Sequence, residues 1–226
     1  KTAAFGVRLA LFVGLGATAL FVVLAEPIVA LLFQRGQFGP AATRETARAL
    51  MAQGLGIWTA AVVRQLVAVY FALGDTRTPV KIAAADLCVF VGLALVLRGP
   101  LGHVGISLAV TGAGLAQMSL LWWRLGRHLP DRRGAEIAGS AARSGAAALG
   151  GAALGWLVNR GLSELELLER GARLGGLGGE ALKALPALAG SLAFCVGFLS
   201  VAALLKSQEL ATLAGPVLRR LRRTPA

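Results

Sequence analysis

Long apolar runs alternate with short polar turns along almost the whole chain. Three uncharged runs approach or reach the length of a membrane-spanning helix, and they cover residues 9–25, 104–123 and 184–205. Three more reach it only by including a charged residue or borrowing from their ends, and they cover residues 49–73, 82–97 and 137–158. A bilayer core of about 30 Å needs about 20 helical residues. The pattern therefore predicts six membrane-crossing helices.

Turn and cap residues set the expected helix boundaries. The first helix is expected to run without a break over residues 7–33, and Glu26 marks where its outer end meets polar groups. Thr43 offers N-cap chemistry for a second helix that ends at Leu73. Thr78 is expected to cap the third helix, with Pro79 at its first position.

A longer polar linker after the fourth helix predicts two parts. Residues 1–130 form a part with four helices, and residues 131–226 form a two-helix part with a basic tail. The glycine-rich outer loop, residues 159–183, is long enough to hold a short amphipathic helix at the membrane surface.

The composition excludes most soluble classes of protein. Of the 226 residues, 56% are hydrophobic and 15% are charged, which is more apolar surface than one soluble core can hide. The runs lack the alternation of barrel strands, so the expected fold class is all-α and polytopic. Cys88 and Cys195 lie inside apolar runs without metal-ligand spacing, and we interpret them as small core residues. No catalytic or metal-binding pattern is visible, so we expect no enzyme activity, no cofactor and no metal.

The net charge of +12 follows the expected membrane topology and does not indicate nucleic-acid binding. Lys and Arg are more frequent on the side of the membrane that holds both chain ends, and the positive-inside rule makes that side cytoplasmic. The basic residues on this side are Lys1, Arg8, Arg77, Lys81, Arg124, Arg127, Arg132, Arg133, Lys206, Arg219, Arg220, Arg222 and Arg223.

Arg64 is the most informative charged residue, because a basic side chain near the bilayer centre costs about 2.5 to 3.5 kcal/mol on insertion scales. Counted from Gly74, it lies roughly 15 Å into the membrane, and Asp86, counted from Thr78, lies roughly 12 Å deep. We therefore predict that Arg64 and Asp86 pair, or line a common cavity that receives a charged substrate. An isolated structural ion pair and a lipid-facing position remain alternatives.

Other charged and small residues are weaker candidates for the same cavity. Glu26 and Arg48 lie nearer the helix ends, as does Arg143, and a side chain that reaches the interface is the simpler interpretation for the two arginines. Glycines recur within the first, second, fourth and fifth helices, and close helix packing is the default interpretation for them.

Three strings carry a resemblance to a known family. They are LLFQRGQF at residues 31–38, GDTRTPVKIA at residues 74–83 and GHVGISLA at residues 102–109. In this order and spacing they resemble the C-terminal half of the MurJ (MviN) lipid II flippases, as does the stretch at residues 63–72, where that family usually has a proline near Val69. The resemblance covers roughly Leu9 to Arg127, and the last two helices match only in position and hydropathy.

The resemblance implies a fourteen-helix protein of the multidrug/oligosaccharidyl-lipid/polysaccharide exporter superfamily in the bacterial inner membrane. This chain would supply helices 9 to 14, with the last two forming a groove for the undecaprenyl tail of lipid II. The partners implied are lipid II, a coupling ion or the membrane potential, and an N-terminal lobe of the same protein. The motif residues implied are those of an inner gating turn, Asp75, Arg77, Thr78 and Pro79, and of an outer turn, Arg35 and Gly36.

Two other functions remain open. A related exporter of the same superfamily would carry another lipid-linked oligosaccharide or a drug. A non-transporting scaffold for cell-wall synthesis would need no cavity for a charged substrate.

Overall fold

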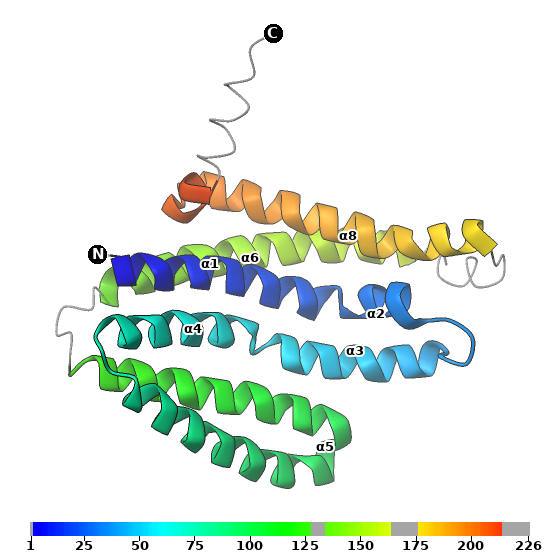
Figure 1. Ribbon diagram of the computed structural model, residues 1–226. Helices are drawn as coiled ribbons and strands as arrows, with labels where there is room; N and C mark the ends of the chain where they lie inside the picture. The colour runs from blue at the N-terminus through cyan, green and yellow to red at the C-terminus, as the bar shows by residue number, and fades with distance from the viewer. Residues whose placement is uncertain (1, 128–133, 164–175, 214–226) are drawn as a thin grey trace.

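The computed structural model describes residues 2–127, 134–163 and 176–213 (Figure 1). In these ranges the chain forms helices and turns and no strand, so the all-α prediction is confirmed there. Residues 208–213 form a further short helical segment. The helices are α1 (Thr2–Val23), α2 (Ala25–Phe33), α3 (Pro40–Gly54), α4 (Ile57–Ala72), α5 (Arg77–Leu125), α6 (Gly134–Ser163) and α8 (Gly176–Leu204).

The described helices make the six passes that the hydropathy pattern predicts. α1 continues into α2 and α3 into α4, while α5 folds back into two arms at Gly102, whose φ of 55° and ψ of −133° favour a residue without a Cβ (Figure 1). α6 and α8 complete the set. Among the described residues, the helices long and apolar enough to cross a membrane cover Ala3–Val23, Pro40–Ala72, Arg77–Leu125 and Ala184–Leu204.

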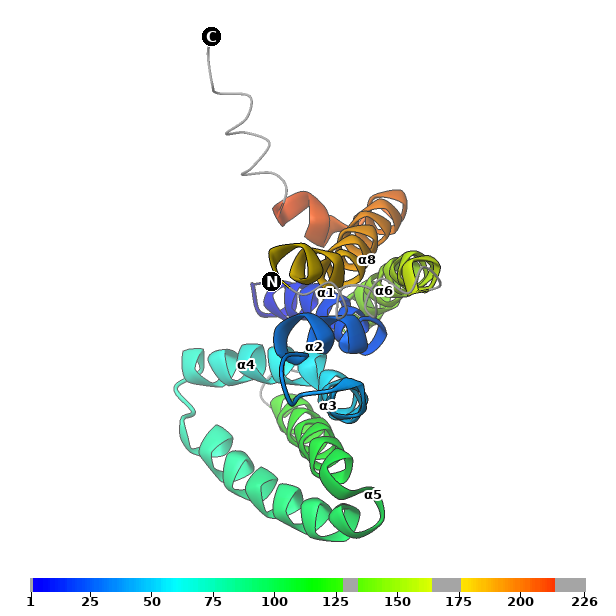
Figure 2. The same ribbon diagram turned by 90° about the vertical axis from the view of Figure 1, so that its right-hand side faces the viewer.

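α1 lies at the centre of the assembly. It packs against α4 on one side and α6 on the other, while α8 covers α6 and α5 lies against α3 and α4 (Figure 2). Two adjacent residues of α1 belong to different apolar clusters. Leu11 packs in a cluster with Leu66 of α4 and Leu121 of α5. Phe12 packs in a second cluster with Phe194 of α8. α1 therefore connects the last two helices to the rest of the bundle.

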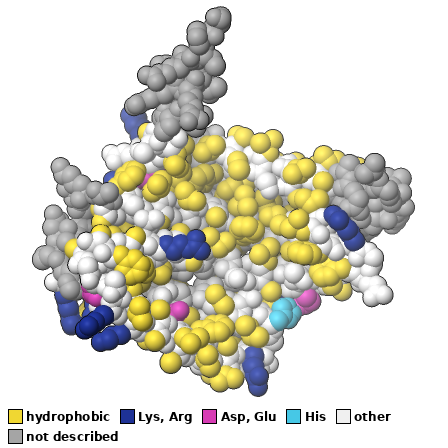
Figure 3. All heavy atoms as spheres, viewed as in Figure 1, with side chains coloured by type: hydrophobic (Ala, Val, Ile, Leu, Met, Phe, Trp, Pro, Cys, Tyr) yellow, Lys and Arg dark blue, Asp and Glu magenta, His cyan; other side chains and the backbone are white. Residues whose placement is uncertain are grey.

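Hydrophobic side chains cover much of the face of the molecule that Figure 3 shows. A soluble protein rarely exposes contiguous apolar surface of this extent, and the exposed residues lie on the membrane-length helices. This agrees with a bilayer as the solvent for these helices. The most exposed of them include Val80, Leu95, Val96, Leu149, Leu188, Leu192 and Leu204.

The prediction of one unbroken helix over residues 7–33 is wrong. The chain bends at Leu24, which separates α1 from α2. The cause is Pro27, because proline has no N–H for the carbonyl of the residue four positions earlier and its ring clashes with that carbonyl. The N–H of Leu24 still donates to the carbonyl of Leu20, and the carbonyl of Leu24 accepts the N–H of Ile28. Both backbone groups of Leu24 therefore keep a hydrogen bond at the bend.

The second predicted helix is also divided, at Leu55 and Gly56, and its start was misplaced. α3 begins at Pro40 with Gly39 as the N-cap, whereas the sequence favoured Thr43. Thr43 is buried within the first turns, and its hydroxyl donates to the carbonyl of Gly39 at 3.2 Å. Proline is well suited to a first helical position, and here it outweighs the capping residue.

Two further boundaries differ from the prediction. α5 begins at Arg77, two residues before the predicted start, with Thr76 as its N-cap. The outer loop is shorter than predicted, because α6 continues to Ser163 and α8 starts at Gly176. The amphipathic helix predicted for this loop falls largely on residues 164–175, which lie outside the described residues.

The interpretation of the two cysteines as core residues is wrong. Both Cys88 and Cys195 are exposed on the helix surface. A small apolar side chain inside an apolar run is equally compatible with a lipid-facing position. Because the whole run is apolar, the sequence does not show which face of the helix is buried and which faces lipid.

Candidate functional site

A cavity of about 270 Å³ opens where the break between α3 and α4 faces both arms of α5. Its walls combine small, apolar and polar side chains, and Asp86 is the one carboxylate among them. The lining residues from α3, the break and α4 are Gln53, Gly56, Ile57, Thr59, Ala60 and Val63. Those from α5 are Asp86, Val110, Gly114 and Gln117.

Side-chain hydroxyls support the broken helix beside this cavity. The N–H of Gly56 bonds to the carbonyl of Gln53, so the carbonyl of Ala52 loses its regular helical partner. The buried hydroxyl of Thr111, on α5, donates to that carbonyl at 2.8 Å. The hydroxyl of Thr59 donates to the carbonyl of Gly56 at 2.7 Å. The carbonyl that the break frees at Ala52 is thus satisfied by a side chain of another helix.

The packing interpretation of the glycines holds at this place. A Cβ on Gly56 would lie 2.9 Å from the hydroxyl oxygen of Thr111, and one on Gly114 would lie 2.9 Å from that of Thr59. The two glycines therefore allow α5 to approach the α3–α4 break closely.

Asp86 lines this cavity, but within the described residues it does not pair with Arg64. Its Oδ1 is buried and has no hydrogen-bond partner among the described residues. Arg64 is exposed on α4 and does not line the cavity, and no ion pair joins the two described side chains. Arg64 comes four positions after Ala60 and seven after Ile57, which both line the cavity, so it continues their face of α4 one turn beyond Ala60. The depth estimate matched the two residues along the membrane normal but could not show that the exposed side chain of Arg64 lies outside the cavity lining.

The weaker candidates lie away from this cavity, and Glu26 and Arg48 are on exposed surfaces. Glu26 is exposed in the first turn of α2, where a carboxylate complements the helix dipole. Arg48 bonds to Glu45 at 2.8 Å, with 65% and 52% of the two side chains exposed. Arg143 is partly buried, and its Nε has no hydrogen-bond partner among the described residues. It lines a polar cavity near Arg8, at the opposite side of α1 from α4.

The inner turn is held by its own motif residues. Gly74 has φ of 76°, which favours glycine. The Asp75 Oδ1 accepts the N–H of Thr78 at 2.9 Å at the start of α5, and Pro79 is buried in the first turn. Arg77 is exposed.

The outer turn uses the same chemistry. Gly36 has φ of 55°, and the guanidinium of Arg35 donates to the carbonyl of Leu31 at 3.4 Å. The contacts within both motifs therefore explain how the two turns are formed.

Comparison with known proteins identifies the family of this chain. Residues 1–167 match the family model for lipid II flippase MurJ. The chain belongs to this family. The resemblance seen in the sequence is thereby confirmed.

Curated MurJ relatives align with about half of this chain. The probable lipid II flippase MurJ of Rhizobium meliloti (strain 1021) is 39% identical over 130 residues, which are 55% of this chain and 24% of the relative. That of Synechocystis sp. is 38% identical over 112 residues, or 50% and 21%. The lipid II flippase MurJ of Burkholderia cenocepacia is 35% identical over 97 residues, or 43% and 19%. The matched region thus spans about a quarter of the length of these MurJ proteins or less.

A solved MurJ structure shows the same fold. The structure is that of lipid II flippase MurJ in an inward closed conformation, with a TM-score of 0.59 and 17% sequence identity. The similarity covers 84% of this chain and 37% of that one. It therefore extends to helices beyond the part matched by the family model.

Several residues of the candidate site escaped the sequence analysis. These residues, which lie at the cavity or at the break, are Gln53, Thr59, Thr111 and Gln117. They are uncharged polar residues, and such residues alone do not mark a site within a membrane helix. The available signal was the pair Gly54 and Gly56 within an otherwise apolar run, which marks the place where the helix divides.

Proposed function

We propose that this chain acts as the C-terminal part of a lipid II flippase. It would move the undecaprenyl-pyrophosphate-linked peptidoglycan precursor from the inner to the outer leaflet of the bacterial inner membrane by alternating access. The match of residues 1–167 to the MurJ family carries this proposal. Because the matched region is about a quarter of its relatives' length, an N-terminal lobe is a necessary partner. The sidedness of Lys and Arg supports a topology with both ends in the cytoplasm.

The physical task is to carry an anionic headgroup past hydrocarbon. A pyrophosphate loses its hydration in the membrane core at a high free-energy cost, so it needs a polar passage while its tail stays in the lipid. Broken helices beside a polar cavity are a common way to build such a passage in transporters. We propose that an ion gradient or the membrane potential supplies the energy.

Arg64 and Asp86 have separate roles in this proposal. The exposed side of α4 around Arg64 would face the N-terminal lobe across the substrate passage, where a guanidinium can bond two phosphate oxygens at once. Asp86 would act from the neighbouring cavity, since its buried oxygen without a partner favours a polar or cationic group there. The α6–α8 pair, with its exposed apolar side chains, would lie beside the lipid tail.

The test is complementation of flippase-depleted cells by the chain joined to its N-terminal lobe. A hydrogen bond to a charged group contributes about 1.5 to 3 kcal/mol, so Arg64→Gln should reduce lipid II in the outer leaflet by about tenfold or more. Asp86→Asn should reduce it as well. Arg98→Gln, at an exposed arginine just before the bend of α5 at Gly102, is the matched control and should behave as wild type. Wild-type transport by both site variants, at equal expression, would remove the two residues from the mechanism.

A further inference from the structure

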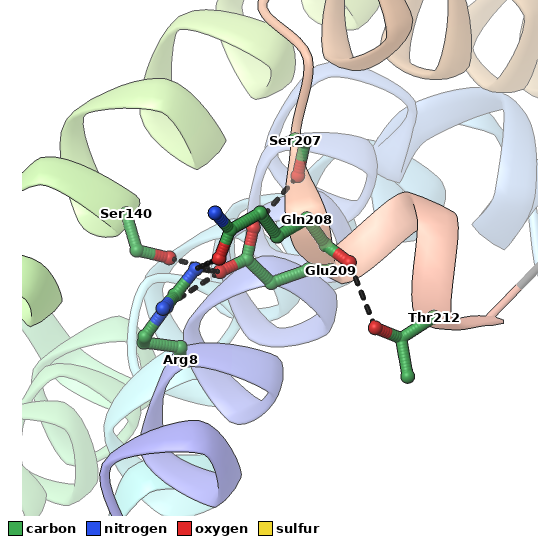
Figure 4. Close-up of polar contacts among 6 residues, drawn as sticks. All are labelled: Arg8, Ser140, Ser207, Gln208, Glu209 and Thr212. Carbon is green, nitrogen blue, oxygen red and sulfur yellow. Dashed lines mark hydrogen bonds and ion pairs between the residues drawn. The ribbon is translucent and has the colours of Figure 1, made fainter. Parts of the chain in front are cut away.

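A buried carboxylate joins three parts of the chain that are far apart in sequence (Figure 4). Glu209 is fully buried, and its Oε1 accepts from Arg8 Nε at 2.7 Å and from the Ser140 hydroxyl at 2.8 Å. Its Oε2 accepts from the Ser207 hydroxyl at 2.8 Å. The guanidinium of Arg8 also donates to the Gln208 side-chain oxygen at 2.9 Å. The cluster thus connects α1, the start of α6 and the segment that follows α8.

The chain reverses direction to bring Glu209 to this place. α8 ends in a turn in which Ser207 donates its N–H to Ala202 and Lys206 donates its N–H to Ala203, the arrangement of a Schellman motif. Lys206 occupies the position where glycine is usual, with φ of 50°. A lysine in the left-handed region is unfavourable in isolation, so contacts elsewhere must hold the reversal.

Near this cluster, the main contact of α8 with α1 is that of Phe198 with Phe12, whose ring centroids lie 4.8 Å apart. α8 packs mainly on α6, and α6 packs on α1. The segment of residues 207–213, which we call the strap, therefore spans from the end of α8 back to α1. A buried ion pair contributes most to structure when further hydrogen bonds satisfy it, and both oxygens of Glu209 are satisfied.

We propose that the strap locks the end of the α6–α8 pair onto α1 through Glu209, so that the pair and α1 move as one body. This rests on the proposed transport function, because a locked end restricts where the bundle opens during alternating access. Movement between the lobes would then leave the α1–α6–α8 contact unchanged at this end.

The lock should hold at every physiological pH. Burial, the largest influence, would raise the pKa of the Glu209 carboxyl group, but hydrogen bonds, including those from Ser140, Ser207 and Arg8, lower it from 4.5 to about 2. A lowered pKa stabilises the structure above 4.5, and this stabilisation is lost as the pH falls from 4.5 through about 2.

Among the described residues, Arg143 and Glu136 are charged groups that line a cavity of about 340 Å³ with Arg8. The spin-label distances described below should therefore stay constant from pH 8 to pH 5 and broaden only in stronger acid. A change near neutral pH that persists in Glu209→Gln would assign the pH response to another group.

The experiment measures the distance between spin labels in the chain joined to its N-terminal lobe. With Cys88 and Cys195 replaced by serine, labels at Val13→Cys and Ala203→Cys report on the strapped end, since both positions are exposed on α1 and α8. Labels at Val13→Cys and Ala68→Cys report on α1 and α4 as a reference pair. Wild type should give a narrow distribution for both pairs.

Glu209→Gln and Arg8→Gln should each broaden the strapped pair only, and the double variant should broaden it no further. Amide exchange of residues 207–211 should accelerate by about tenfold or more in the same variants. Glu45→Gln with Arg48→Gln removes an exposed Arg–Glu pair and should change neither measurement.

A strapped pair that is equally narrow in Glu209→Gln, or already broad in wild type, would overturn the lock. These readouts do not depend on transport. Narrow distances in a protein that fails to complement would count against the proposed function and leave the strap in place.

Discussion

Gly151→Leu is expected to separate α6 from α8 and to destabilise the protein by about 3 kcal/mol or more. A Cβ at this position would lie 2.9 Å from the carbonyl oxygen of Phe194 and 3.1 Å from the backbone nitrogen of Phe198. Overpacking usually costs about 1 to 3 kcal/mol when side chains can shift. Here the obstacle is backbone, so the helices themselves must move. Thermal unfolding of the purified protein in detergent measures the effect.

Gly145→Leu provides the matched control on the same helix. A Cβ at Gly145 meets no atom within 4 Å, and leucine has a higher helix propensity than glycine by roughly 1 kcal/mol. Its melting temperature should therefore equal or slightly exceed that of wild type. If the two leucine variants melt at the same temperature, close packing of α6 on α8 through Gly151 is not what stabilises this pair.

The membrane-crossing pattern of this fold could be predicted from the sequence because length and hydropathy are local properties. The two helix breaks illustrate the limit. Pro27 was visible in the sequence, and its effect on the preceding turn follows from proline chemistry. Gly54 and Gly56 marked the place of the second break, but its support was not visible, because the hydroxyl of Thr111 on α5 comes from more than fifty positions away.

The candidate site shows a different limit. Counting residues from a turn gives depth, and that estimate brought Asp86 to the level of a real cavity. It says nothing about contacts between side chains, so it could not show that Arg64 and Asp86 form no ion pair within the described part of the chain. Burial of Val62, Leu66 and Tyr70 against α1 and α5 fixes how α4 packs, and this packing depends on parts of the chain that are distant in sequence.

The strap lay outside the sequence analysis altogether. Arg8 was counted only as a basic residue near the inner surface, and Glu209 follows an apolar run without any motif around it. A carboxylate among many basic residues was a weak signal. Its partner two hundred positions earlier is a property of how α1, α6 and α8 assemble.

Thr111→Val is the second substitution for which we expect a large effect. Valine keeps the shape of threonine but removes the hydroxyl that donates to the carbonyl of Ala52 at 2.8 Å. A buried acceptor that loses its partner costs about 1 to 3 kcal/mol. The close contact with Gly56 should survive, because a valine methyl group takes the place of the hydroxyl oxygen and the Cα and Cβ of Thr111, which also lie beside Gly56, are unchanged. The expected result is a lower melting temperature in detergent.

Thr111→Ser separates the hydrogen bond from packing. Serine retains the hydroxyl and loses one methyl group, which contributes roughly 0.8 kcal/mol when buried. We therefore expect the valine variant to be the less stable of the two and to complement less well, since the broken helix borders the candidate cavity. Equal stability of the serine and valine variants would show that the break is maintained by the backbone near Gly56 and does not need the hydroxyl group from α5.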